Sequence, residues 1–163
     1  MKSVSKSKKE KPDVIIVAQN RAASYNYTIL DKVEAGLVLV GTEVKSLRGG
    51  KGSLREAYAD AKKGELWLQN CHIPEYMAGG PWNHEPLRPR KLLLHRREMD
   101  KFAGKVQAKG LTLIPLKIYF RGGRAKCELA LAQGKQHHDR RQAERDKEAR
   151  REANEAMYKH RRR

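Results

Sequence analysis

The chain is poor in aromatic residues and in cysteine, and its two cysteines are not spaced like the ligands of a zinc site. Aromatic side chains make up 6% of its 163 residues, and there are two cysteines, Cys71 and Cys127. Neither has a C-x-x-C partner, and the pairs Cys71-His72 and His137-His138 are adjacent rather than spaced like zinc ligands. The sequence therefore predicts two reduced thiols packed in strands and no metal site.

Long hydrophobic runs are also missing. No segment approaches the roughly 18 consecutive apolar residues of a membrane-spanning helix, and the lysine-rich start of the chain lacks the apolar centre of a signal peptide. No basic stretch carries Trp, Phe or Leu gathered on its opposite face, which disfavours an anionic membrane as partner. We expect a cytoplasmic protein without membrane contact that is monomeric when free.

Acidic residues are scarce relative to basic ones. The 36 Lys and Arg outnumber the 19 Asp and Glu, which gives a net charge of +17 and a pI near 10.1. Such an excess favours a polyanionic partner and says little about the fold. Nucleic acid is the leading candidate.

No catalytic pattern is present either. Possible acids and bases such as Glu43, His84 and His95 stand in no recognisable catalytic spacing. The segment Gly49-Gly50-Lys51-Gly52-Ser53 lacks the spacing of a phosphate-binding loop, and we interpret it as a tight basic turn. We expect no enzymatic activity and no cofactor.

The stretch Leu37 to Arg48 is the most informative local pattern. It opens as an apolar run typical of a buried strand, and Gly41-Thr42 allows a turn with Thr42 as the N-cap of a short helix. On that helix Lys45 and Arg48 share one face, while Val44 and Leu47 share another that packs on the core. A rigid element would thus present two cations.

Most of the remaining chain is predicted to form hairpins. The predicted pairs are Tyr25–Leu30 with Leu37–Val40 across a turn at Asp31–Gly36, Ala57–Ala61 with Glu65–Ile73, and Leu111–Phe120 with Arg124–Leu131. Pro115 is expected at a bulge or edge, and Arg96–Ala108 has the apolar spacing of a helix that ends at Gly110. About six strands in hairpins predict a small closed antiparallel barrel of the OB type with flanking helices.

The two ends of the chain differ in composition from this barrel. Residues 1–13 are predicted to be a flexible basic N-terminus, and residues 14–132 the barrel domain. Residues 133–163 contain 11 Lys/Arg and 6 Asp/Glu and no wide apolar stripe. We expect this basic tail to be disordered when free and helical against RNA, with a merely solvated helix as the alternative.

Several motifs in a fixed order carry a resemblance to a known family. They are Glu34-Ala35-Gly36-Leu37, Gly41-Thr42-Glu43-Val44-Lys45-Ser46-Leu47-Arg48, Arg90-Lys91-Leu92-Leu93-Leu94-His95, Pro115-Leu116 with Tyr119-Phe120, and Gly134-Lys135 followed by His138-Asp139-Arg140-Arg141. From about Asn20 to Arg151 the chain resembles the SsrA-binding protein (SmpB) family.

The resemblance implies a non-enzymatic RNA-binding factor with an OB-like barrel. Such a factor binds the tRNA-like domain of transfer-messenger RNA and delivers it to stalled ribosomes for rescue by trans-translation. The C-terminal tail would probe the empty mRNA channel. Small-subunit rRNA and elongation factor Tu are the other implied partners.

The resemblance also assigns residues. RNA-binding positions of the family fall at Asn20, Glu34, Leu93 and Lys126, and the functional tail starts at Gly134, Asp139, Arg140 and Arg141. We add neighbouring residues able to contact phosphate or bases, namely Arg21, Tyr25, Lys45, Arg48, Lys51, Arg90 and Lys91. For the tail we add Lys135, His138, Met157 and Tyr158.

Some of these assignments leave alternatives open. Leu93 could pack on a splayed base, although filling the core is the more common role of such a leucine. Ala22-Ala23-Ser24-Tyr25 replaces a stretch that is usually basic and contains a histidine in the family, and Tyr25 is suited to stack on a base instead. The alternative function is a general basic RNA-binding or ribosome-associated protein without specificity for transfer-messenger RNA.

Overall fold

A computed structural model describes residues 13–161. The predicted flexible N-terminus lies outside the described residues except for Asp13. In chain order the elements are β1 (Val14–Gln19), α1 (Ala23–Asn26), β2 (Tyr27–Leu37), α2 (Gly41–Arg48), β3 (Tyr58–Lys62), β4 (Glu65–Gln69), the 3-10 segment η1 (Met77–Trp82), β5 (Arg90–Leu93), α3 (Arg96–Lys109), β6 (Thr112–Arg121), β7 (Arg124–Gly134) and α4 (His137–Arg161).

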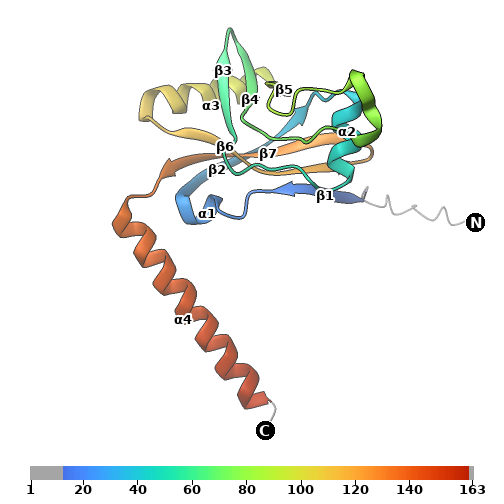
Figure 1. Cartoon of the computed structure of the whole chain (residues 1–163). Coiled ribbons are helices and arrows are strands. Elements are labelled where there is room, and N and C mark those ends of the chain that lie inside the picture. The colour runs from blue at the N-terminus through green and yellow to red at the C-terminus, as the bar shows by residue number, and fades with distance from the viewer. Residues whose placement is uncertain (1–12, 162–163) are drawn as a thin grey trace, which may run out of the picture.

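The strands close into an antiparallel barrel (Figure 1). Within the described residues there are seven strands in the order β1-β6-β3-β4-β5-β2-β7, and pairing of β6 with β7 completes the ring. The predicted closed antiparallel barrel of about six strands is confirmed: the ring consists of β6, β3, β4, β5, β2 and β7, and β1 pairs with β6 in addition. Leucine and isoleucine side chains with no exposed surface fill its centre, among them Leu47, Leu68, Ile73, Ile118 and Leu129.

The predicted hairpin within residues 25–40 is wrong. The supposed turn at Asp31–Gly36 is the middle of the single long strand β2, and Tyr25 lies in α1. Polar residues are tolerated there because Lys32 and Glu34 lie on the exposed face of the strand. Asp31 shares the face of Val33 and Ala35 but is half-buried, and its carboxylate pairs with Lys101 of α3 at 3.3 Å. A bulge between Ile29 and Asp31 shifts the register against β7 without breaking the strand.

The two later hairpins and the central helix are confirmed. β3 pairs with β4, and β6 pairs with β7 around Gly122-Gly123, whose φ values of 57° and 76° require glycine-like freedom. The register shifts between Pro115 and Lys117, which is the bulge predicted for that proline. α3 buries Phe102 and stops before Gly110, a left-handed residue with φ of 60°.

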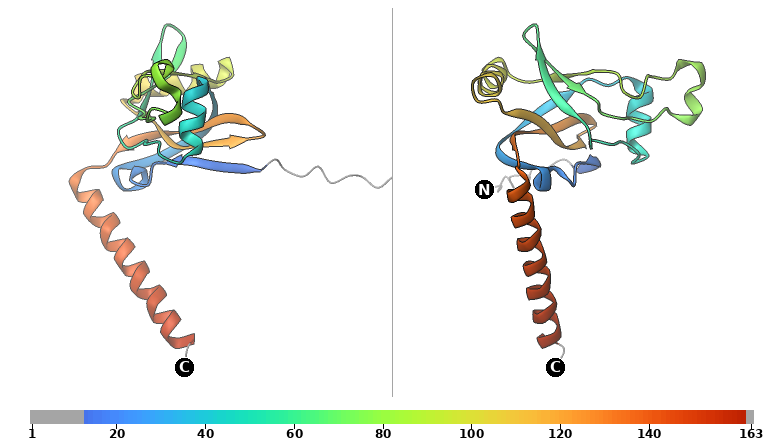
Figure 2. Two further views of the ribbon diagram at one scale, coloured as in Figure 1. Left: turned by 45° about the vertical axis from the view of Figure 1, so that its right-hand side comes forward. Right: turned by 60° about the vertical axis from the view of Figure 1, so that its left-hand side comes forward.

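The tail is a single helix that projects away from the barrel (Figures 1 and 2). Strand β7 continues to Gly134, so the barrel extends two residues further than the predicted limit at 132. Most α4 side chains are exposed over its 25 residues. Disorder of the tail in the free protein stays a prediction.

Candidate RNA-binding surface

Helix α2 is held at its start by its own glutamate. The prediction that Thr42 is the N-cap is wrong, because Val40 holds that position and its N–H donates to Glu43 Oε2 at 3.0 Å. The Thr42 hydroxyl lies 2.8 Å from Nδ1 of His84 instead. As predicted, Leu47 is buried and Val44 packs against the core.

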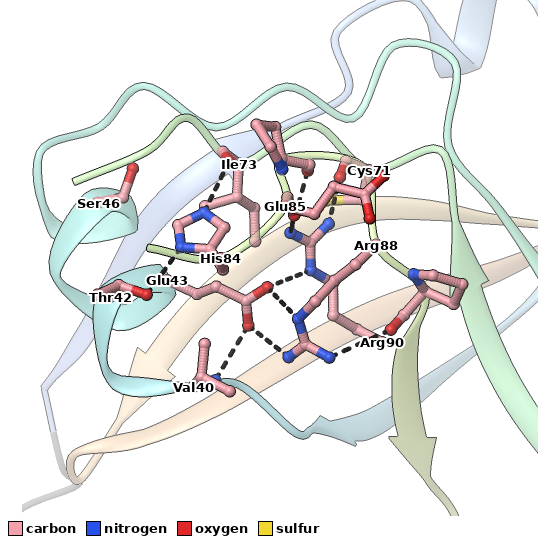
Figure 3. A network of polar contacts seen from close by, with 12 residues as sticks. Val40, Thr42, Glu43, Ser46, Cys71, Ile73, His84, Glu85, Arg88 and Arg90 are labelled. Carbon is pink, nitrogen blue, oxygen red and sulfur yellow. Dashed lines mark hydrogen bonds and ion pairs between the residues drawn. The ribbon is translucent and has the colours of Figure 1, made fainter. Parts of the chain in front are cut away.

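Glu43 is the centre of a buried ionic network (Figure 3). Its Oε1 accepts hydrogen bonds from Nε of Arg88 and from Nε of Arg90, each at 2.8 Å, and Oε2 accepts one from Arg88 Nη2 at 2.8 Å. Burial by itself would raise the pKa of Glu43, but the hydrogen bonds from Arg88, Val40 and Arg90 outweigh it and hold the pKa below its ordinary value.

This network overturns one site prediction. The Arg90 side chain is fully buried and its remaining donors are used by the carbonyls of Cys71 and Pro86. It therefore cannot reach an RNA phosphate, and Arg90 is a structural residue. The adjacent Lys91 points to the other side of β5 and pairs with Glu65 at 2.6 Å while staying partly exposed.

Lys45 and Arg48 are both exposed on α2, as the sequence predicted. Each lies over an aromatic ring at 5.5 Å, Lys45 over Tyr76 and Arg48 over Phe120. Lys51 is exposed in the turn that follows the helix. All three cations are therefore open to solvent.

Glu34, Leu93 and Lys126 come together in one groove. They line a cavity of about 750 Å³ together with Gly36, Leu37, Leu94, His95, Glu98, Arg124 and Ala125. Leu93 is 53% exposed, so the core role that the sequence favoured for it is wrong. Leu93 on β5 lies directly opposite Gly36 on β2. A Cβ on Gly36 would lie 3.2 Å from Leu93 Cβ, so the missing side chain leaves room for the leucine.

Glu34 organises the charges beside this groove. Its Oε2 accepts a hydrogen bond from the Tyr119 hydroxyl and lies 3.0 Å from Nη1 of Arg121, and its Oε1 lies 4.0 Å from Lys126 Nζ. The carboxylate thus orients the neighbouring cations Arg121 and Lys126. The sequence-based site did not include Tyr119, Arg121 or Arg124. The predicted hairpin around Gly122-Gly123 could have pointed to Tyr119, because the β6–β7 register places it opposite Lys126.

Asn20 and Arg21 lie apart from that groove. The Asn20 amide donates to the carbonyls of Leu54 and Pro115, both at 3.4 Å, which ties the end of β1 to the barrel. Arg21 is exposed and lines a second cavity, of about 470 Å³, with Gly50 and Gly52 on either side of Lys51. The sequence-predicted residues are therefore distributed over more than one surface.

Tyr25 and Lys135 join the tail to α1. The Tyr25 hydroxyl donates to Glu144 Oε1 at 2.9 Å, and this hydrogen bond raises the pKa of Tyr25. Lys135 Nζ donates to the Ser24 carbonyl at 2.8 Å.

The other predicted tail residues lie at or beyond this junction, and most of them are exposed. Gly134 ends β7, Arg140 is half-buried, and the exposed remainder comprises His138, Asp139, Arg141, Met157 and Tyr158.

The cysteines are free and buried as predicted, but only Cys127 lies in a strand, because β4 ends at Gln69 before Cys71. Burial raises the pKa of Cys71 to about 11. Across residues 13–161, no cluster of three His, Cys, Asp or Glu side chains could hold a metal ion. In the same part of the chain, no helix is long and apolar enough to cross a membrane.

These features define a class of protein: a small basic antiparallel barrel with a charged groove and a projecting basic helix. Residues 17–159 match the family described as "SmpB protein". The chain belongs to the SmpB family, which confirms the resemblance found in the sequence.

Individual relatives agree with this assignment. An SsrA-binding protein of Bradyrhizobium diazoefficiens is 55% identical over 146 residues, covering 89% of this chain and 92% of the relative. One from Rhodopseudomonas palustris (strain BisA53) is 56% identical over 142 residues, covering 86% and 90%. A chain from the solved structure "tmRNA-SmpB: a journey to the center of the bacterial ribosome" is 51% identical, with a TM-score of 0.63, over 73% of this chain and 84% of that one.

Proposed function

We propose that this protein binds the tRNA-like domain of transfer-messenger RNA and delivers it to stalled ribosomes for rescue by trans-translation. The observation that carries the proposal is the groove in which Glu34, Leu93 and Lys126 converge, in a chain of the SmpB family. Its relatives are named for binding SsrA RNA, and the solved neighbour is named together with tmRNA and the bacterial ribosome.

The groove has the chemistry to bind a folded RNA. Lys126 supplies a cation for a phosphate, while Glu34 can accept a hydrogen bond from a base or a 2′-hydroxyl. Leu93 offers an exposed apolar face beside them. Tyr119 and Arg121 hold the carboxylate in place, so the donors and acceptors are preorganised before RNA arrives.

The tail has a separate role in this proposal. α4 carries exposed cations along its length and lacks an apolar face that could pack on the barrel. Such a helix suits the vacant mRNA channel, where rRNA phosphates surround it. We further propose that elongation factor Tu joins the delivery complex, that the free protein is a cytoplasmic monomer, and that it has no enzymatic activity.

The groove is tested by removing one charge inside it and one outside it. Lys126→Ala should weaken binding of the tRNA-like domain and lower the slope of log affinity against log salt by about one unit, because one phosphate contact is lost. Lys62→Ala removes the same charge on exposed β3, and it should leave both quantities unchanged. Equal effects of the two substitutions would mean that net charge, and not the groove, binds the RNA.

A further inference from the structure

Two large apolar side chains stand out on one short segment. Met77 is 95% exposed and Trp82 is 87% exposed, the two highest values for large hydrophobic residues among residues 13–161. They lie at the two ends of η1, which sits next to α2 at the periphery of the barrel, where both figures show it in yellow-green (Figures 1 and 2). Exposed Trp in a protein with few aromatics suggests a binding role.

The segment is held in place by hydrogen bonds rather than left loose. The Asn83 side chain accepts from the Tyr76 N–H and donates to the Tyr76 carbonyl, each at 2.8 Å, and thereby closes the loop at its base. The next residue, buried His84, is bonded to the Ile73 carbonyl at 2.9 Å and to α2 through Thr42. Trp82 is therefore presented on a fixed support.

The residues beside η1 are acidic, whereas those on the neighbouring α2 are basic. Glu75 and Glu85 are exposed at either side of η1, so the loop itself does not favour a phosphate. The cations lie on α2, where Lys45 stacks over Tyr76 at 5.5 Å and Arg48 is exposed one turn later. This arrangement suits a nucleotide strand whose phosphates meet α2 and whose base meets an aromatic ring.

The chain leads directly from the groove into α2. Leu37 lines the groove, the Val38 N–H bonds to the Lys91 carbonyl at 3.0 Å, and α2 begins at Gly41. We propose that Trp82 is a stacking platform for an unpaired base of the tRNA-like RNA that occupies the groove, with Lys45 and Arg48 binding phosphates of the same RNA. This inference rests on the proposed function and extends the RNA footprint to η1.

Tryptophan fluorescence tests this directly because the chain has two tryptophans, Trp67 and Trp82. In a Trp67→Phe variant of the full chain, Trp82 is the sole emitter, and saturating tRNA-like domain should quench it. Trp82→Ala and Trp82→Leu should each weaken binding by about 5- to 100-fold, the range of one base–aromatic stack, while Trp82→Phe should largely restore it. Lys45→Ala with Arg48→Ala should reduce the quenching at any given RNA concentration.

The controls keep this test separate from the proposed function. Leu30→Ala removes an exposed side chain of β2 outside the proposed surface and should bind like wild type. If the Trp67→Phe variant binds the RNA while its Trp82 emission is unchanged at saturation, or if Trp82→Leu binds as tightly as wild type, the stacking platform is wrong. Another occupant, such as a protein, would give that result. Failure of wild type to bind would contradict the proposed function itself.

Discussion

Glu43 and Arg90 form a fully buried ion pair at 2.8 Å that links α2 to β5. Removing one partner of such a pair leaves an uncompensated charge without water, at a cost of about 3–5 kcal/mol. We expect Glu43→Gln to lower the free energy of unfolding strongly in urea titrations, although both side chains are nearly the same size. A loss below about 1 kcal/mol would mean that the network contributes little.

The same pair predicts a pH dependence. The pKa of Glu43 is held below its ordinary value near 4.5, so the unfolded state binds the proton more readily. The stabilisation is therefore complete above pH 4.5 and is lost as the pH falls through the lower pKa of the folded state. Glu43→Gln should abolish this part of the acid sensitivity, which urea midpoints measured between neutral and acid pH will reveal.

Tyr119 is expected to act on RNA only through Glu34. Its ring is buried, and its hydroxyl donates to the Glu34 carboxylate. Tyr119→Phe removes that bond and should weaken binding of the tRNA-like domain by about 5-fold, equivalent to about 1 kcal/mol. In a Glu34→Ala background the same substitution should have no further effect, since the group it positions is gone. Additive losses would assign Tyr119 an independent role.

The tail is predicted to lack stable structure before it meets the ribosome. Beyond its first turns, α4 shows exposed side chains, and an isolated helix of that kind is marginal in water. Amides from residues 146–161 should exchange much faster than those of β6 and β7 in hydrogen-exchange mass spectrometry. Small subunits with an empty mRNA channel should slow them. Strong protection in the free protein would instead support a permanently formed solvated helix.

Local chemistry made the hairpins predictable. Gly122-Gly123 and Pro115 specify a turn and a bulge within a few residues of themselves, so no knowledge of distant partners was needed. β2 was split in error because Asp31 and Glu34 look like turn residues. Their charges are satisfied by Lys101 and Arg121, which lie far along the chain.

Distant partners also explain the errors at the site. Arg90 is buried because it pairs with Glu43, which lies 47 residues earlier in the chain. Nothing in the local sequence distinguishes such an arginine from one that binds RNA. Leu93 follows buried Leu92 on a strand, so the alternation that exposes it becomes evident only once the strand is placed. The convergence of Glu34, Leu93 and Lys126 likewise depends on the pairing of β2 with β5 and β7.

Competition binding at physiological salt tests the central claim most directly. Labelled tRNA-like domain of transfer-messenger RNA, bound to the full chain, would be challenged with unlabelled tRNA-like domain, bulk tRNA or duplex DNA. We predict that the unlabelled tRNA-like domain competes far more effectively than the other two, because the groove recognises shape as well as charge. Equal competition by all three would mean that the net charge of +17 drives binding, and would contradict specific recognition.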